Sequence, residues 1–540
     1  MALANPGSAC SWIWQQGRNW KLHNSSNCNQ LEKPISSRKS AFLFFPDLIA
    51  SQTMITASSY HTKTCYERHH MGGHALDWEN QPDTFKHYKG IKHIQLPDVR
   101  DFSPFKTSFF SLPQKTIVSS SARINFSIDE VARILILTQA ITARSRGGGT
   151  DFWFRSAASA GALYPTEIYL ASRSVAGLDD GIYHYSAFDH CLAQIRQGSF
   201  VNLEGEADFG VVFFFTAIFF RSSWKYRDRA YRYNLLDTGH VMENHILALK
   251  AMNIHYRIHY DFDDREVNLL LGIEDVREVA LVLVDIPGLA SLSLKTQKNE
   301  LAPLPSQIAE ASRVARVEKD YDLLRQFNES CIEVRPHSAA KISDKLGLRL
   351  EPVTGIIENP EDKVLFDYPE VLFQRRSKRN FMGRAISPSA LAKISAAMMT
   401  EPYPYVAAGM LLGPSEAIPS GLYVFDQESR SIYRAAEGGF NDAMADICLH
   451  QMWIAAASIH FVFLSNLDII DGSAGPRGYR YAMIGAGRMG QRLYLAATAL
   501  GIGCCGIGAF YDREAAELLG LDDKSRMLYL VAVGSIKNRS

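Results

Sequence analysis

The chain has few cysteines, no excess charge of either sign and no long apolar run. Its 540 residues include 8 cysteines, none in a C-x-x-C pair, which argues against a disulfide framework or a cysteine-based zinc site. Lys and Arg number 57, as do Asp and Glu, so nothing attracts nucleic acid or an anionic membrane in general. The most apolar stretches, 41–45 and 209–220, are far shorter than the ~20 residues of a membrane helix. We expect a cytoplasmic protein without metal, nucleic-acid partner or membrane partner.

What the chain does have is an internal repeat. Arg-Ala-Tyr-Arg-Tyr at 229–233 reappears as Arg-Gly-Tyr-Arg-Tyr at 477–481, an offset of 477 − 229 = 248. The same offset carries Asp-Arg-Glu at 264–266 onto Asp-Arg-Glu at 512–514, without a gap. Since 540 residues exceed one ordinary core, the repeat predicts two copies of one fold.

The order of apolar patterns predicts an α+β class for each copy. We place the first copy at 120–287, the second at 370–540, a connector at 288–369, and a leader at 1–57. In the first copy the predicted elements are a helix at 129–143, a strand at 167–172, hairpin strands near 182 and 193, a strand at 211–220, helices at 231–252 and 264–271, and a strand at 279–286. The connector is expected to hold one helix at 307–326.

A basic cluster opens the second copy, and it suits an anionic phosphate. Gln-Arg-Arg-Ser-Lys-Arg at 374–379 places Arg375, Arg376, Ser377 and Arg379 in a short run, and guanidinium groups bind phosphate oxygens in pairs. The alternative is a solvated charge run before a helix. Lys537 and Arg539, which follow the last apolar run, could complete the same site or form a frayed end.

Two small-residue loops would let the backbone approach a flat ligand closely. The first comprises Ser156, Ser159, Ala160, Gly161, Ala162 and Leu163. The second, in the other copy, comprises Cys505, Gly506, Ile507 and Gly508. The counterpart of the second loop at 256–262 contains no glycine. The alternative for both loops is a purely structural turn.

These motifs resemble the FMN-dependent nitroreductase superfamily, and within it the SagB-like (thiazole/oxazole-forming) dehydrogenases. The resemblance rests on Ser-Ala-Gly-Ala-Leu-Tyr-Pro at 159–165, Lys-Tyr at 225–226, Arg-Arg-Ser-Lys-Arg at 375–379, and Leu-Gly-Ile-Gly at 500–503 leading into Ile-Gly-Ala at 507–509. Further elements begin at 58, which makes 58–119 a SagB-like N-terminal segment.

The resemblance implies two tandem nitroreductase-like domains that form a pseudo-dimer within one chain, with FMN at their interface. In such dimers one subunit's basic run and closing basic residues hold the phosphate, and the partner's small-residue loop meets the flavin ring. One site would then combine 375–379, 505–508, Lys537 and Arg539 with the loop at 156–163. A second site would combine 119–123 with 407–414, but it lacks the arginine pair, the glycine loop and a basic tail. We therefore expect one FMN per chain.

Lys225 and Tyr226 are the expected catalytic pair, because an ammonium beside a phenol stabilises the phenolate that a base requires. The alternative is an exposed lysine beside an anchoring tyrosine. The resemblance implies an FMN-dependent oxidoreductase that oxidises a peptide-derived or small heterocyclic, azoline-like substrate by hydride transfer to flavin. It also implies a peptide-modifying complex as a possible partner. The other readings are an NAD(P)H-dependent nitro- or quinone-type reductase and a flavin-binding pseudo-enzyme scaffold.

Three further patterns are not expected to carry chemistry. Gly-Ala-Gly-Arg-Met-Gly at 485–490 matches a dinucleotide fingerprint but lies inside a predicted long helix. His69, His70 and His74 lack an accompanying ligand pattern. The adjacent cysteines at 504–505 are expected to pack a tight loop rather than to form a redox pair.

Overall fold

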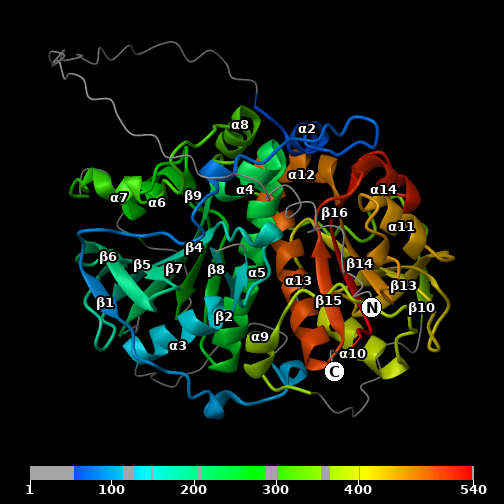
Figure 1. Ribbon diagram of the computed structural model, residues 1–540, viewed down its shortest axis with the longest axis horizontal. Helices are drawn as coiled ribbons and strands as arrows, with labels where there is room; N and C mark the ends of the chain where they lie inside the picture. Colours follow the sequence, from blue (N-terminus) through cyan, green and yellow to red (C-terminus); the bar gives the residue numbers. More distant parts are fainter. Residues whose placement is uncertain are drawn as a thin grey trace, which may run out of the picture. The chain divides into compact units, whose positions relative to one another are not determined.

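Two antiparallel sheets of identical strand order organise the chain (Figure 1). The computed structural model describes residues 54–112, 126–147, 150–203, 208–287, 294, 301–353, 365–400 and 402–537. Within these residues each large sheet has seven strands, in the orders β1-β6-β5-β4-β7-β9-β8 and β10-β13-β12-β11-β14-β16-β15. The second order is the first one repeated in the second half of the chain, which confirms the predicted repeat.

The strands of the first sheet are β1 (His93–Gln95), β4 (Thr166–Arg173), β5 (Gly181–Ser186), β6 (Cys191–Gln197), β7 (Gly210–Ile218), β8 (Arg257–His259) and β9 (Glu278–Ile286). Those of the second are β10 (Glu351–Val353), β11 (Ala407–Leu412), β12 (Gly421–Asp426), β13 (Ser431–Glu437), β14 (Ile459–Asn466), β15 (Gly503–Ile507) and β16 (Ser525–Gly534). The central strands β7 and β14 are buried along their whole length, as their continuous apolar sequences predict.

Helices of the two repeats correspond in the same way. The first repeat has α3 (Ile128–Gln139), α4 (Phe219–Tyr226), α5 (Ala230–Ala251) and α6 (Asp264–Leu271). The second has α10 (Pro388–Met398), α12 (Leu467–Ser473), α13 (Gly478–Ala499) and α14 (Asp512–Leu518). The other α-helices of the described residues are α2 (Ala57–Lys63), α7 (Ser306–Glu310), α8 (Asp322–Ser330), α9 (Glu370–Gln374) and α11 (Asn441–Ile447). The fingerprint-like run at 485–490 lies inside α13, as expected.

The long helices α5 and α13 pack side by side between the two sheets (Figure 1). A Cβ at Gly239 would lie 2.3 Å from the carbonyl oxygen of Ile484, and one at Gly487 would lie 2.2 Å from that of Leu236. The offset of 248 relates these two glycines, so each helix brings the same position to the crossing. Both helices are buried on nearly every side, because each packs on its own sheet and on the other helix.

Reciprocal ion pairs also join the two repeats. Asp512 of α14 accepts hydrogen bonds from Arg229 (2.7 Å) and Arg232 (2.6 Å) of the first repeat. Its counterpart Asp264 of α6 accepts from two second-repeat arginines, Arg477 at 2.7 Å and Arg480 at 2.5 Å. Self-complementary contacts of this kind are typical of an interface between two copies of one fold. The chain therefore forms an α+β pseudo-dimer with itself.

Two predicted helices differ from the observed ones: one ends earlier, and the other is divided into two. The helix predicted at 129–143 begins at a capping box on Ser127 and ends at Gln139, after which the chain enters a two-stranded sheet of β2 (Ile141–Gly147) and β3 (Thr150–Arg155). The helix predicted at 307–326 is wrong as one element: α7 and α8 are separated because Val314, between them, packs into a small apolar cluster with Leu163 and Trp224. Tertiary contacts override local propensity at both places.

Candidate functional site

A cavity of about 180 Å³ lies where the two repeats meet, and both contribute to its wall. The first repeat supplies Ala158, Ser159, Ala160, Gly161, Tyr226, Tyr233, Leu236, Asp237 and His240. The second supplies Ser377, Arg379, Gln451, Trp453, Tyr494, Cys505, Gly506, Ile507, Gly508, Ala509 and Tyr529.

Strand β15 and the residues that follow it form part of the wall, and two glycines there have no room for a side chain. A Cβ at Gly506 would lie 1.8 Å from the hydroxyl of Tyr529, and one at Gly508, just beyond the strand, would lie 2.4 Å from the ring of Tyr233. The backbone N–H of Gly506 donates to the Tyr494 hydroxyl at 2.7 Å. Glycine at these positions lets aromatic side chains line the cavity directly against the backbone.

A tight turn at 159–164 contributes Ser159, Ala160 and Gly161 to the wall. Gly161 has a φ of 66°, in the left-handed region. A Cβ there would lie 2.9 Å from the Tyr226 hydroxyl and 3.3 Å from Lys225 Nζ. The turn and the end of α4 therefore place the predicted Lys-Tyr pair together. Lys225 Nζ also lies 5.4 Å from the centre of the Tyr226 ring.

Asp237 of α5 holds this turn from its other side. The Ser159 hydroxyl donates to Asp237 Oδ2 at 2.5 Å, and the Ala160 N–H donates to Oδ1 at 3.1 Å. The carboxyl is buried, and burial raises its pKa to about 7. A carboxyl that can change protonation near neutral pH thus lies in the cavity wall.

His240, one turn further along α5, is held in its neutral form. Its Nδ1 and the Gln491 side-chain oxygen are 2.9 Å apart, and its Nε2 lies 3.1 Å from the Tyr529 hydroxyl. Burial lowers the pKa of His240 to about 4. His240 therefore contributes hydrogen bonding rather than charge at neutral pH.

The arginine pair braces the small-residue loop. Arg375 is buried, and its guanidinium donates to the carbonyl oxygens of Ser156 at 2.5 Å and Arg155 at 3.0 Å. Its Nη1 is buried without a hydrogen-bond partner. Arg376 donates to the Thr142 hydroxyl at 3.1 Å and to its carbonyl oxygen. These contacts tie the start of the second repeat to the loop of the first.

The rest of the basic run faces the cavity more directly. Ser377 and Arg379 line it, and the Arg379 guanidinium lies 5.6 Å from the centre of the Trp453 ring. Lys537 pairs its backbone with Asn380, with Lys537 N–H donating at 3.1 Å. Arg539 lies outside the described residues.

The expected site residues therefore fall into two groups. Those in the cavity wall are Ser159, Ala160, Gly161, Tyr226, Ser377, Arg379, Cys505, Gly506, Ile507 and Gly508. The second group does not line the cavity but lies in segments that contact or adjoin its wall. Its members are Ser156, Ala162, Leu163, Lys225, Arg375, Arg376 and Lys537.

Sequence reasoning missed further wall residues, chiefly Tyr233, Asp237, His240, Tyr494 and Tyr529. All five lie within long helices or a buried strand. Within α5 nothing distinguished Asp237, because this helix also carries other charged residues such as Arg232 and Glu243. The counterpart of Asp237 at an offset of 248 is Gly485, so the repeat itself marked this position as different.

The corresponding place on the other side of the pseudo-dimer is occupied by side chains. The ring of His337, from the connector, stacks on Tyr481 with 5.2 Å between centres. The Tyr405 hydroxyl is 2.9 Å from His337 Nδ1, and His337 Nε2 is 3.4 Å from Asp261. The loop expected here at 407–414 is wrong, because Ala407–Leu412 is strand β11, the counterpart of β4. The other expected part, 119–123, lies outside the described residues.

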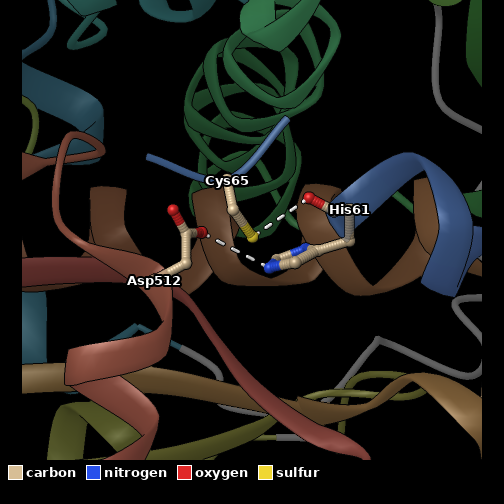
Figure 2. A group of neighbouring side chains, drawn as sticks. All are labelled: His61, Cys65 and Asp512. Carbon is tan, nitrogen blue, oxygen red and sulfur yellow. Dashed lines mark hydrogen bonds and ion pairs between the residues drawn. The ribbon is translucent and has the colours of Figure 1, made fainter. Parts of the chain in front are cut away.

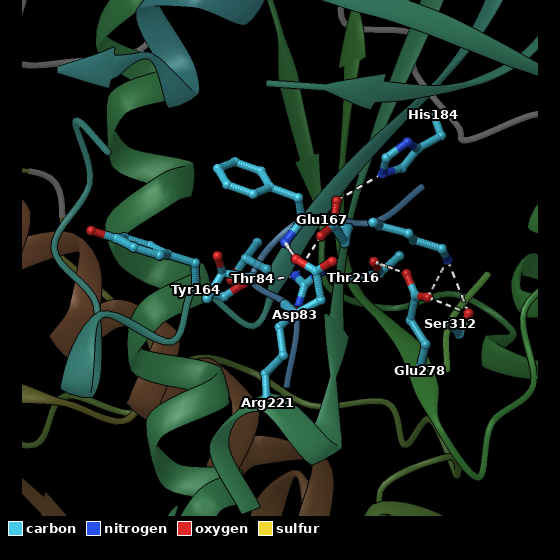
Figure 3. A network of polar contacts seen from close by, with 12 residues as sticks. Asp83, Thr84, Tyr164, Glu167, His184, Thr216, Arg221, Glu278 and Ser312 are labelled. Carbon is cyan, nitrogen blue, oxygen red and sulfur yellow. Dashed lines mark hydrogen bonds and ion pairs between the residues drawn. The ribbon is translucent and has the colours of Figure 1, made fainter. Parts of the chain in front are cut away.

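A buried polar network holds α4 and the end of the 159–164 turn (Figure 3). Arg221 of α4 donates to the carbonyl oxygens of Asp83 at 2.8 Å and Tyr164 at 2.9 Å, and it pairs with Glu167. Glu167 also contacts His184 at 2.7 Å. Since α4 ends at Tyr226, this network fixes the helix that carries the Lys-Tyr pair.

The second half of that network joins the N-terminal segment to the first sheet. Lys86 donates to Glu278 at 2.5 Å and to the Ser312 hydroxyl at 2.9 Å, and Thr216 donates to Glu278 at 2.6 Å. All four side chains are buried. The attractive charge of Lys86 lowers the pKa of the Glu278 carboxyl against the effect of burial.

His61, Cys65 and Asp512 converge closely enough to suggest a metal site (Figure 2). Asp512, however, already accepts hydrogen bonds from Arg229 and Arg232. Burial and the Arg232 guanidinium lower the pKa of His61 to about 3. Two buried guanidinium groups beside the same carboxylate disfavour a cation, so the cluster fits an ion-pair centre.

The exposed histidines expected to be unrelated to metal have other contacts. His70 Nδ1 pairs with Glu67 at 2.6 Å, and His74 Nε2 lies 3.1 Å from the Lys225 carbonyl oxygen. Cys504 and Cys505 are buried in β15. No helix in the described part of the chain is both long and apolar enough to cross a membrane.

The paired sheets, the crossing helices and the cavity between repeats define an α+β pseudo-dimer within one chain. The nitroreductase family model matches residues 128–285 and 372–535. The chain therefore belongs to the nitroreductase family.

Named relatives agree with this assignment. A Methanocaldococcus jannaschii protein assigned by name to the nitroreductases is 32% identical over 182 residues, covering 31% of this chain and 89% of the relative. The trifolitoxin-processing protein TfxB of Rhizobium leguminosarum bv. trifolii is 29% identical over 136 residues (23% of this chain, 36% of TfxB). The microcin B17-processing protein McbC of Escherichia coli is 28% identical over 145 residues (24% of this chain, 52% of McbC).

A solved structure shares the whole architecture. The crystal structure of an Anabaena variabilis protein described as a nitroreductase superimposes with a TM-score of 0.68 at 24% identity, covering 89% of this chain and 99% of that one. The likeness extends over both repeats, so the single-chain pseudo-dimer is a fold that another protein also adopts.

Proposed function

We propose that the chain is an FMN-dependent oxidoreductase, a SagB-type dehydrogenase that oxidises an azoline-like ring in a peptide-derived or small heterocyclic substrate. The observation that carries this proposal is the placement of Lys225 and Tyr226 against Gly161 at the wall of the inter-repeat cavity. The relation to TfxB and McbC, which are named for processing trifolitoxin and microcin B17, supports a peptide-derived substrate.

The residues present fit FMN. Gly506 and Gly508 line the cavity together with Tyr233 and Tyr529, so a flat ring there would meet backbone and aromatic groups. Ser377 and Arg379 supply a hydroxyl and a guanidinium for a phosphate, and Arg375 keeps a buried Nη1 without a hydrogen-bond partner nearby in the chain. FMN, when bound there, would accept the two electrons that the oxidation releases.

Lys225 and Tyr226 carry out the removal of the substrate proton. Tyr226 Oη, as phenolate, removes a proton from the substrate ring, and Lys225 Nζ stabilises the negative charge that Tyr226 carries before it does so. Gly161 leaves space for both groups, since any side chain there would collide with the Tyr226 hydroxyl. The network around Arg221 keeps α4, and with it the pair, at a fixed distance from the turn.

Two measurements test the proposal. The purified protein should show a flavin absorbance spectrum with one FMN per polypeptide, and it should oxidise an azoline-containing peptide with dioxygen as the final oxidant. A colourless protein that cannot be reconstituted with FMN would remove the proposal.

The relation to the M. jannaschii protein favours a second candidate, an NAD(P)H-dependent nitro- or quinone-type reductase. Consumption of NAD(P)H with a nitroaromatic, and no oxidation of azolines, would favour this reaction. Bound FMN that a chemical reductant bleaches rapidly, with turnover of neither substrate, would instead indicate a flavin-binding scaffold in a peptide-modifying complex.

A further inference from the structure

One buried carboxyl in the cavity wall has no part in the chemistry proposed above. Asp237 lies in α5 and accepts from the Ser159 hydroxyl at 2.5 Å and from the Ala160 N–H at 3.1 Å. Asp237, Ser159 and Ala160 all line the cavity. The carboxyl thus contacts the turn that, at Gly161, lies against Tyr226 and Lys225.

The hydrogen bonds of Ser159 depend on whether Asp237 carries a proton. A serine hydroxyl has one proton to donate and two lone pairs to accept with. One lone pair of Ser159 accepts the Tyr164 N–H at 2.9 Å. When Asp237 is ionised, the single hydroxyl proton is used on Oδ2. When Asp237 is protonated, the carboxyl donates to Ser159, and the hydroxyl proton is released to donate elsewhere.

We propose that the protonation of Asp237 decides whether Ser159 offers a hydrogen bond to a ring in the cavity, so that flavin retention depends on pH through this pair. The inference rests on the proposed function for the identity of the ligand, whose ring carbonyls accept hydrogen bonds. Asp237 is a positioning residue in this scheme, because it acts through Ser159. Binding is tighter with the carboxyl protonated and weaker once it is ionised.

The groups that surround Asp237 do not mask this effect. Burial raises the pKa of Asp237 to about 7, with the Ser159 and Ala160 hydrogen bonds opposing that rise. On the same helix, His240 has a pKa lowered to about 4 and burial raises that of Tyr233 well above its usual value. From β16, Tyr529 likewise has a raised pKa. His240, Tyr233 and Tyr529 therefore stay neutral between pH 6 and pH 8.

Charged groups from other elements also reach this region. Lys225 and Tyr226 approach the turn at Gly161, and Arg375, which lowers the pKa of His240, braces the loop at Ser156. Arg379 lines the same cavity. A variant that removes only the Asp237 charge leaves all of them in place, so their contribution cancels in a comparison with wild type.

The test is the dissociation constant of FMN for the full-length apoprotein, measured by quenching of flavin fluorescence from pH 6 to pH 8. For the wild type we expect the dissociation constant to rise about fivefold, the effect of one lost hydrogen bond. Asp237→Asn should show only the pH dependence that the FMN phosphate contributes and should bind near the wild-type value at pH 6, because the amide donates to Ser159 as the protonated carboxyl does. The phosphate of FMN titrates equally in every protein, so the ratio to wild type isolates the Asp237 effect.

A second variant tests whether Asp237 acts through the Ser159 hydroxyl rather than through its charge alone. Ser159→Ala should also lose the wild-type pH dependence, and it does not depend on Asp237→Asn folding. Asp261→Asn, a carboxyl in the filled place of the other repeat, is the matched control and should retain the wild-type pH dependence. An unchanged pH dependence in Asp237→Asn or in Ser159→Ala would overturn the inference. Absence of FMN binding to the wild type at every pH would remove the proposed function itself.

Discussion

The two repeats share one scaffold but differ in what they build at their interface. Gly239 and Gly487 occupy the same position in the helix crossing, and Asp264 and Asp512 accept equivalent arginine pairs. These contacts obey the pseudo-twofold relation. The cavity does not: it lies on one side, and His337 fills the corresponding place on the other.

The difference shows which features the fold requires and which the site requires. Where β15 and the residue after it have Gly506 and Gly508, the first repeat has Ile258 and Tyr260. Where α5 has Asp237, α13 has Gly485. Residues that join the repeats are kept in both copies, whereas residues that would hold a ring occur in one. A duplicated chain can lose one site without losing the interface, because different residues form the two.

The largest expected effect concerns the shared interface. Asp512→Asn and Asp264→Asn should each lower the free energy of unfolding by about 3–5 kcal/mol, because each leaves two buried guanidinium groups without a carboxylate. Urea denaturation of both variants measures the effect. A loss below about 1 kcal/mol for either one would contradict the reciprocal interface.

Acid should weaken the same interface. Arg229 and Arg232 hold the pKa of the Asp512 carboxyl well below its ordinary value. A carboxyl with a depressed pKa stabilises the fold fully above the pKa of the unfolded chain, about 4, and loses that contribution as the pH falls further. Asp512→Asn should therefore show a shallower loss of stability below pH 4 than the wild type.

The next effect concerns the chemistry of the cavity side. Tyr226→Phe should lower turnover of an azoline substrate about 100-fold, because the phenyl ring has no group to take the proton. Tyr481→Phe, on the filled side, should change turnover less than about twofold. Steady-state kinetics at equal FMN content compares them, and full turnover by Tyr226→Phe would refute its role as base.

A third comparison concerns the room for a ring. Gly508→Ala should lose most of its bound FMN and about 1–3 kcal/mol of stability, because the added Cβ would lie 2.4 Å from Tyr233. Its counterpart Tyr260 already carries a large side chain, so Tyr260→Phe should keep the wild-type flavin content. Released-flavin absorbance gives both values, and full FMN content in Gly508→Ala would contradict the predicted ring position.

The smallest expected effect is on the filled side. His337→Ala removes the ring that stacks on Tyr481, but it restores neither a glycine pair nor a counterpart of Arg375. The variant should therefore still bind one FMN per chain, with a loss of stability of about 1 kcal/mol. Two tightly bound FMN per polypeptide, in the variant or the wild type, would contradict the single-site proposal.

Much of the fold follows from local patterns. Strands β7 and β9 are continuous apolar runs, the repeat appears at a constant offset, and α6 follows an aspartate cap at Asp263. The β2–β3 hairpin was not predicted, because only the pairing of Ile141–Gly147 with Thr150–Arg155 reveals it. The gap between α7 and α8 was missed for a similar reason, since Val314 packs on residues far away in sequence.

The candidate site divides in the same way. The loop at 159–161 and the run at 505–508 are contiguous and rich in small residues, so sequence reasoning could find them. Asp237, His240 and Tyr494 lie in α5 and α13, which are buried on almost all sides and show no polar face to mark the residues that meet the cavity.

The sequence by itself determined that this chain holds two copies of an α+β unit, because an offset of 248 preserves the same residues in order. It also indicated that the copies are unequal, because the Arg375-Arg376 pair and the glycines at 506 and 508 occur only in the second copy. Only the tertiary structure decided that Asp237 meets Ser159, that His337 fills the other side, and that Arg375 braces a loop 219 residues away. These contacts arise where the two repeats or the connector meet, and no local pattern encodes a distance between segments so far apart.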